Sequence, residues 1–212
     1  AKDFDVIHFH VDVLQFLLVR RCPTPCVTTL HGRLDLPDLA ALYRHFPEQA
    51  LVSISDSQRE PLPWVNWRDT VHHGLPVDLY QFHPQPDPYF AFLGRISPEK
   101  RVDRAIEIAI ACGVPLRIAA KVDNADRTYF EQRIRPLLDH PLIHFIGEID
   151  DRAKNEFLGR ARALLFPIDW PEPFGLVMLE AMACGTPVIA SRASSIPEVA
   201  GDSALLLDPN DD

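Results

Sequence analysis

The chain has 212 residues, enough for one large or two small domains whose core needs no disulfide or metal to hold it together. Its 21 lysine and arginine residues against 30 aspartate and glutamate residues give a net charge of −9. That surplus argues against a nucleic-acid partner and against a polybasic membrane surface. Four cysteines without a paired spacing and a sequence without an 18-residue apolar run indicate a reduced, cytoplasmic protein with no transmembrane segment.

Short apolar runs alternate with helical patterns through the first part of the chain. The sequence predicts strands at 6–10, 25–30, 50–55 and 70–72, and helices at 12–21 and 39–46. Strands separated by helices favour a parallel sheet with crossover helices. A stretch with three alternating prolines, at 82–88, then predicts a linker, because proline interrupts both strand ladders and helices.

The alternation restarts after the linker. The sequence predicts strands at 89–93, 116–121, 143–146, 163–167, 187–191 and 203–207, and helices at 98–112, 127–138, 152–161 and 176–184. This part is typical of a doubly wound α/β domain. The domain boundary is therefore expected between residues 83 and 84.

Two cations follow the strand at 89–93, where an open α/β sheet binds its ligands. Gly94 permits a tight turn, and Arg95 and Lys100 flank the start of the next helix, predicted near Pro98. A helix N-terminus with two cations beside it suits a diphosphate. The residues alone leave open the alternative that both are ordinary exposed cations.

Two glutamates mark the segment after the strand at 163–167. Glu180 lies within an apolar helix, where a buried carboxylate must be hydrogen bonded or paired. It would either pair with a structural arginine or accept hydrogen bonds from ligand hydroxyls. Glu172 precedes that helix, between two prolines. Eight residues along a helix span about 12 Å, more than the about 5–9.5 Å between glycosidase carboxylates, so a two-carboxylate hydrolase is disfavoured.

The sequences GRISPEK at 94–100 and EPFGLVMLEAMACGTPVIA at 172–190 resemble retaining glycosyltransferases of the GT-B fold, family 4 (glycosyl transferases group 1). The E-x7-E pair of that family would be Glu172 and Glu180. The sequences DVIHFH at 5–10, TTLHG at 28–32, SISDS at 53–57 and HGLPVD at 73–78 resemble the later part of the family's first domain.

The resemblance implies an α/β, GT-B-like fold with two Rossmann-like doubly wound parallel-sheet domains. Residues 1–83 would be the later part of an incomplete acceptor-side domain. Residues 84–212 would be the nucleotide-sugar-binding domain, lacking its final helices. The sequence departs from the family at 192–198, where RASSIPE stands in place of a Gly-Gly before Pro-Glu.

The resemblance also implies a role for each matching position. Arg95 and Lys100 would bind the donor diphosphate and stabilise the leaving phosphate, and Glu180 would bind the ribose hydroxyls. Glu172 would face the donor sugar, and His31 would contact the transferred sugar; a loop histidine satisfied by the protein is the alternative for His31. The other donor-binding positions would be Gly94, Gly147, Glu148, Ile149, Phe174, Gly175 and Leu176.

No cofactor or metal is expected, because the family's chemistry needs none, and His8 and His10 alternate onto one strand face without an evident third ligand. The implied activity, in the EC 2.4 class, moves a sugar from a nucleoside diphosphate to an acceptor hydroxyl with retention of configuration. Two alternatives stay open: a nucleotide-sugar-binding fragment without transferase activity, and a GT-B-fold epimerase or phosphorylase. The sugar, the nucleobase and the acceptor stay open as well.

An incomplete first sheet would expose an edge and apolar surface. We therefore expect either a fragment of a longer protein or a homodimer that covers this sheet. Peripheral membrane association of a longer parent is compatible with the sequence.

Overall fold

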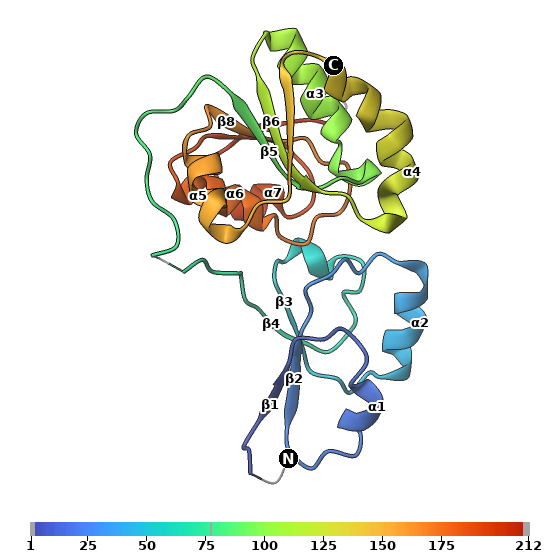
Figure 1. The fold of residues 1–212 in the computed structure, drawn as a ribbon. Helices are drawn as coiled ribbons and strands as arrows, with labels where there is room; N and C mark the ends of the chain where they lie inside the picture. Colours follow the sequence, from blue (N-terminus) through green and yellow to red (C-terminus); the bar gives the residue numbers. More distant parts are fainter. Residues whose placement is uncertain (1–2, 77, 210–212) are drawn as a thin grey trace. The chain divides into compact units, whose positions relative to one another are not determined.

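The computed structural model describes residues 3–76 and 78–209. Its contacts divide the chain into two compact units (Figure 1). Unit 1 comprises Ala1–His73 with Pro171–Phe174, and unit 2 comprises Gly74–Trp170 with Gly175–Asp212. By these contacts the segment 74–83 groups with unit 2, while the boundary expected at 83/84 stays a prediction. Among the described residues, no helix is long and apolar enough to cross a membrane.

Unit 1 is a four-stranded parallel sheet with two helices. The strands run in the order β1-β2-β3-β4, with β1 at Ile7–Phe9, β2 at Cys26–Thr29, β3 at Leu51–Ser53 and β4 at Trp67–Thr70. The helices are α1 (Phe16–Val19) and α2 (Pro37–His45), and a 3-10 turn, η1, spans Ser57–Arg59. Phe16, Tyr43 and Leu51 lie at the centre of the core, so both helices pack on the sheet.

Two sequence predictions in unit 1 are wrong in their bounds. The strand predicted at 70–72 lies at Trp67–Thr70, where Trp67 is opposite Leu51 and Thr70 is opposite Ser53. Its exposed centre includes Arg68 and Asp69, so it lacks the apolar alternation that marks a strand. The helix predicted at 12–21 is reduced to the four residues of α1.

Unit 2 is a six-stranded parallel sheet in the order β10-β9-β8-β5-β6-β7. The strands are β5 (Phe90–Arg95), β6 (Leu116–Lys121), β7 (Ile143–Gly147), β8 (Ala163–Phe166), β9 (Val188–Ser191) and β10 (Leu205–Leu207). The helices are α3 (Val102–Cys112), α4 (Arg127–Tyr129), α5 (Asp151–Gly159), α6 (Leu176–Ala183) and α7 (Ile196–Ala200). From β7 to β10 this is the 3-2-1-4-5-6 order of a Rossmann-like sheet.

Helices cover both faces of the unit 2 sheet (Figure 1). One apolar cluster contains Val102 and Ile106 of α3, and the other contains Leu158 of α5, Met178 of α6 and Ile196 of α7. The doubly wound parallel architecture expected from the sequence is therefore confirmed. The helix α7 was missed, and the segment predicted as one helix at 127–138 is α4 followed by a π turn (Phe130–Ile134) and a 3-10 turn (Arg135–Asp139).

Candidate functional site

The strand order of unit 2 reverses between β5 and β8, which pair side by side. Ligands of open α/β sheets bind at such a switch point, in the crevice outside the carboxyl ends of the two strands. The loops that follow β5 and β8 are joined here by a hydrogen bond of 2.9 Å from the Asp169 amide to the Glu99 carbonyl oxygen. The switch point is therefore bordered by residues of the two segments singled out in the sequence.

Arg95 and Lys100 both lie at this end of β5. Arg95 is the last residue of the strand, and its guanidinium contacts Glu99 Oε1 at 3.2 Å and Asp123 Oδ2 at 3.9 Å. Lys100 Nζ lies 4.4 Å from the ring centroid of Trp170, in the loop after β8. Both cations therefore belong to the segment that borders the switch point, a position that suits a diphosphate.

The helix after β5 does not begin near Pro98, and that prediction is wrong. Pro98–Lys100 form a 3-10 turn, Arg101 has a left-handed backbone with φ 52°, and α3 begins at Val102. The left-handed residue Arg101 separates the turn from the helix. The apolar pattern of the sequence does not indicate such a break, because it reflects only which side chains are buried. Arg101 is a third cation that the sequence reasoning missed, and it contacts Asp169 Oδ2 at 3.5 Å.

The helix after β8 begins as predicted, at Leu176 in α6. Its N-cap is Gly175, with φ 82°, a conformation that residues with a Cβ rarely adopt. A Cβ at Gly175 would lie 2.9 Å from Met178 Cε and 3.1 Å from Ile196 Cδ1, so the position also lacks room. The amide groups in the first turn of an α-helix have no intrahelical acceptor and favour an anion.

Glu180 lies in the middle of α6 and is 7% exposed. Its Oε1 accepts a hydrogen bond of 2.7 Å from Tyr80 Oη and one of 3.3 Å from Lys154 Nζ. The carboxylate is thus paired with a lysine and a tyrosine rather than with the arginine considered from the sequence. Neither bond uses Oε2, which leaves acceptor capacity for a ligand hydroxyl.

The hydrogen bonds to Glu180 change the pKa values of its two partners, Lys154 and Tyr80. Burial lowers the pKa of Lys154, but hydrogen bonds to Asp151 and Glu180 outweigh burial and raise it. Burial, followed by the hydrogen bond to Glu180, raises the pKa of the Tyr80 hydroxyl. Lys154 therefore stays protonated beside the buried carboxylate.

The expected nucleobase positions are the last residue of β7 and the two residues after it, at the same edge of the sheet. Gly147 ends β7 with φ 85°, Glu148 is exposed, and Ile149 packs against the core beneath α5 and α6. The structure thus places Gly147, Glu148 and Ile149 at the carboxyl edge that also carries Arg95 and Lys100.

Glu172, Phe174 and His31 belong to unit 1. Glu172 is 9% exposed, and the Phe174 ring meets the His73 ring edge-on at 5.0 Å between centroids. The Ser55 hydroxyl donates a 2.7 Å hydrogen bond to the Pro173 carbonyl oxygen between them. The predicted site residues are thus divided between the two units.

His31 follows β2 and lies in a row of histidines. Its Nε2 is 2.9 Å from His10 Nδ1, and its Nδ1 is 3.5 Å from His73 Nε2. Burial, then the neighbouring His73 and His10, lowers the pKa of His31. The sequence reasoning missed this grouping. It could have been inferred from the histidines that follow three of the strands: His10 follows β1, His31 follows β2, and His73 stands three residues after β4.

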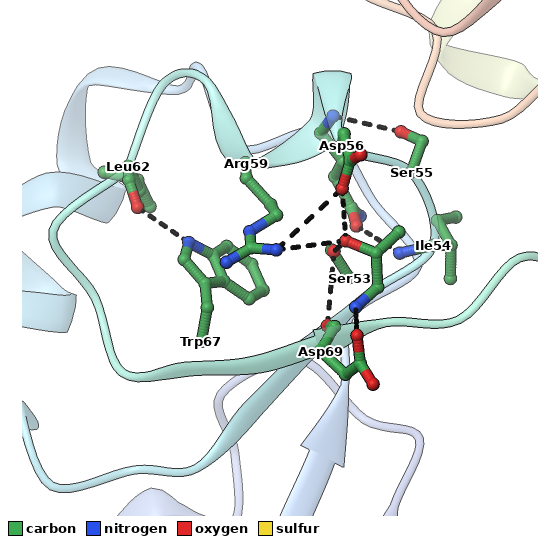
Figure 2. Close-up of polar contacts among 10 residues, drawn as sticks. Ser53, Ile54, Ser55, Asp56, Arg59, Leu62, Trp67 and Asp69 are labelled. Atoms are coloured by element: carbon green, nitrogen blue, oxygen red, sulfur yellow. Dashed lines mark hydrogen bonds and ion pairs between the residues drawn. The ribbon is translucent and has the colours of Figure 1, made fainter. Parts of the chain in front are cut away.

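A polar network fixes the loop between β3 and β4 (Figure 2). Thr70 Oγ1 donates to Asp56 Oδ1 at 2.6 Å, and Arg59 Nη1 donates to Thr70 Oγ1 at 3.2 Å. Ser53 Oγ lies 2.8 Å from the same threonine oxygen, and the Trp67 indole donates to the Leu62 carbonyl oxygen. The turn η1, which carries Gln58, is therefore anchored to both strands.

No group of three or more histidine, cysteine, aspartate or glutamate side chains within residues 3–76 and 78–209 is arranged to hold a metal ion. The expectation that no metal or cofactor is needed stays a prediction.

Comparisons with known proteins agree on one family. Residues 81–212 match the family model described as glycosyl transferases group 1. The phosphatidyl-myo-inositol mannosyltransferase of Mycobacterium leprae (strain TN) is 29% identical over 97% of this chain and 63% of its own length. A GDP-mannose-dependent alpha-(1-6)-phosphatidylinositol dimannoside mannosyltransferase of Mycobacterium tuberculosis is 34% identical over 66% of this chain and 40% of its own. The chain thus spans less than two thirds of these relatives.

Solved structures show the same fold. Anabaena Alr3699/HepE, in complex with UDP and glucose, superposes with a TM-score of 0.82 at 20% identity, over 99% of this chain and 65% of that one. The sucrose-phosphate synthase from Thermosynechococcus elongatus gives a TM-score of 0.80 at 21% identity, over 99% and 62%. These likenesses confirm the predicted GT-B-like fold.

Proposed function

Because the chain belongs to the glycosyl transferases group 1 family, we propose that it moves a sugar from a nucleoside diphosphate to an acceptor hydroxyl, with retention of configuration. One observation supports this most: Arg95 and Lys100 lie at the switch point of a Rossmann-like sheet, where the loops after β5 and β8 meet. This arrangement suits a ligand that presents two phosphates to cations and helix amides.

The proposed chemistry follows from where charge develops. Glycosyl transfer passes through an oxocarbenium-like transition state while negative charge grows on the departing diphosphate. Arg95, Lys100 and the first-turn amides of α6 are fixed before the reaction, so they stabilise that charge without reorganising. In this proposal Glu180 accepts hydrogen bonds from the ribose through Oε2, and Gly147, Glu148 and Ile149 lie beside the nucleobase.

Within unit 1, Glu172 and His31 are proposed to face the transferred sugar, together with Phe174. Both are anchored before a ligand arrives: Glu172 is buried, and His31 is held in the histidine row. The proposal needs no metal, so treatment with EDTA is expected to leave donor binding unchanged.

For the donor we propose GDP-mannose. Both mycobacterial relatives are named as mannosyltransferases, and one is named as GDP-mannose-dependent. Anabaena Alr3699/HepE was solved with UDP and glucose instead, so a uridine donor is the competing choice.

Isothermal titration of the chain with GDP, UDP, ADP and GDP-mannose tests the proposal, alongside a mannosyl-transfer assay. We expect the guanine nucleotides to bind most tightly. Arg95→Ala should weaken nucleotide binding by about 1.5–3 kcal/mol if the cation meets the diphosphate, which is the range for a hydrogen bond to a charged group. Arg135→Ala, an exposed arginine that pairs with Glu131 within one helical segment, is the matched control.

Each outcome separates the competing functions. Nucleotide binding with turnover supports the transferase, and binding without turnover supports a nucleotide-sugar-binding fragment. Epimerised sugar, or sugar phosphate formed from inorganic phosphate, would support a GT-B-fold epimerase or phosphorylase. If no nucleotide binds, or if Arg95→Ala binds as the parent chain does, the assignment of the diphosphate site is wrong.

A further inference from the structure

Three histidines of unit 1 form a row through their ring nitrogens. The centre of the row is His31, which uses Nε2 toward His10 at 2.9 Å and Nδ1 toward His73 at 3.5 Å. The rings of His31 and His73 are nearly parallel, with an interplanar angle of 7°. Each of the three residues comes from a different strand end, so the row is built by the sheet and not by local sequence.

The two contacts of His31 are unequal. An N···N distance of 2.9 Å is an ordinary hydrogen bond, whereas 3.5 Å is at the limit for one. A ligand hydroxyl that replaces a contact of His31 would therefore displace the weaker one, on the Nδ1 edge. The stronger one, to His10, would persist and fix the ring.

The number of protons in the row is also constrained. A neutral imidazole carries one N–H and one acceptor nitrogen, so a neutral His31 donates to one neighbour and accepts from the other. A doubly protonated His31 would donate to both neighbours, which then serve as acceptors. A second proton in the row would place like charges on adjacent rings and break a bond.

A buried glutamine fixes the backbone on both sides of His31. Gln58 is 5% exposed, and its side-chain Nε2 donates to the Leu30 carbonyl oxygen at 3.1 Å and to the Gly32 carbonyl oxygen at 2.8 Å. Its Oε1 accepts a 2.9 Å hydrogen bond from the Ile54 amide. Both amide protons are used, so the side chain is a specific brace between η1 and the loop after β2.

We propose that His10 and Gln58 are positioning residues for His31. Gln58 holds the backbone of the loop, and His10 holds Nε2, so that the Nδ1 edge of His31 is presented to a ligand hydroxyl. That this hydroxyl belongs to a sugar rests on the function proposed above. The positioning itself is a property of unit 1.

The surroundings keep His31 neutral near neutral pH. Three basic side chains surround it, namely His8, His10 and His73, and Asp12 acts in the opposite sense. Burial and the neighbouring bases together lower the pKa of His31, and burial followed by His10 lowers the pKa of His73. A neutral His31 can both accept from and donate to a hydroxyl.

Ring-nitrogen NMR of the 15N-labelled chain between pH 5 and pH 8 tests the role of His10. We expect His31 of the parent chain in one neutral tautomer. His10→Phe keeps an aromatic ring but removes the nitrogen, so His31 should populate both tautomers and its pKa should rise toward the ordinary value. His10→Asn places an amide near the former Nδ1 position and should restore the single tautomer. His45→Phe, at the end of α2, is the control, because the His45 ring packs against Phe46 and His45 does not act on the pKa of His31.

Hydrogen exchange tests the role of Gln58. Gln58→Met removes both donors and should speed exchange of the amides around Leu30–Gly32 by about tenfold, since local opening becomes easier. Gln49→Met is the control, because Gln49 is also buried in unit 1, with 4% exposure, but its side-chain amide donates to Glu48. Comparable acceleration throughout unit 1 in both variants would indicate general destabilisation and overturn the role of Gln58.

The role of His10 is overturned if His10→Phe leaves the tautomer and pKa of His31 as in the parent chain, or if His45→Phe changes them equally. These measurements need neither donor nor turnover. They can therefore fail while nucleotide binding and transfer succeed, or succeed while the transferase proposal fails.

Discussion

At the scale of single residues, the histidine row makes the stability of unit 1 depend on pH. The pKa values of His31 and His73 are lowered in the folded chain, chiefly by burial. Below the ordinary histidine value of about 6.5, the unfolded state therefore binds more protons than the folded state. Stability rises with pH wherever that holds, so it should fall as the pH drops from about 7 to about 5.

The effect is modest because both rings are partly exposed; we expect less than about 1 kcal/mol in total. Urea unfolding of the chain in a Trp170→Phe background, where tryptophan fluorescence comes from Trp64 and Trp67 of unit 1, measures it at each pH. The double variant of His31→Gln and His73→Gln should flatten the dependence, and His45→Gln, at the end of α2, should leave it in place. An equally steep dependence in the double variant would contradict the assignment.

Lys154 gives a second prediction at this scale. It donates to Glu180, whose side chain is 9% exposed, and Lys154 itself is 24% exposed. Lys154→Met removes the cation and leaves a buried carboxylate with Tyr80 alone, which should cost about 1–3 kcal/mol of unfolding free energy. Lys121→Met, which removes an exposed cation paired with Asp123, should leave stability nearly unchanged, because a solvent-screened surface ion pair contributes little. Equal losses would mean that Lys154 contributes no more than a surface ion pair.

At the scale of elements, the start of α6 depends on Gly175. Gly175→Ala must adopt a left-handed backbone, which costs about 1–2 kcal/mol, and its Cβ meets Met178 and Ile196 as well. Gly113→Ala, at the end of α3 with φ 64° and nothing within 4 Å of a Cβ, carries the backbone cost alone. Chemical denaturation should show Gly175→Ala as the less stable variant. If the two variants lose equally, the packing around Gly175 has relaxed.

Most elements of the fold could be predicted because the apolar patterns of strands and helices differ in period. The strand–helix alternation correctly predicted two parallel sheets, and an apolar run predicted α6. The misses have local causes. β4 was misplaced because Arg68 and Asp69 are exposed in it, and the start of α3 was misplaced because Arg101 is left-handed.

The places of some candidate residues in the fold could be predicted because each stands in one continuous segment: Arg95 and Lys100 at and after the end of β5, and Gly175 at the start of α6. Their roles in a donor site stay a prediction. What the sequence could not reveal are partners from distant segments: Tyr80 and Lys154 on Glu180, and Gln58 beside His31. These contacts depend on tertiary packing, and sequence spacing does not encode them.

At the scale of the whole molecule, unit 1 exposes apolar side chains around α1. Leu14, Leu17 and Leu18 are 82%, 69% and 73% exposed, and β1 forms one edge of the described sheet. Contiguous exposed apolar surface favours association. This exposed surface is compatible with the homodimer expected from the sequence. The homodimer stays a prediction, which sedimentation velocity tests. Leu17→Lys should shift the chain toward monomer, and a parent chain that is monomeric at all concentrations would contradict it.

The two units have separate apolar cores, so a donor that binds the switch point should stabilise them unequally. Ligand binding to the folded state stabilises it by mass action, by about 2.7 kcal/mol at a concentration of 100 times Kd. Hydrogen exchange with saturating GDP should therefore slow most in unit 2, at 94–101, 147–149 and 175–180. Arg95→Ala at the same GDP concentration should lose that protection, while Arg135→Ala should keep it. Protection spread evenly over both cores would instead indicate that the nucleotide stabilises the chain without using the proposed diphosphate site.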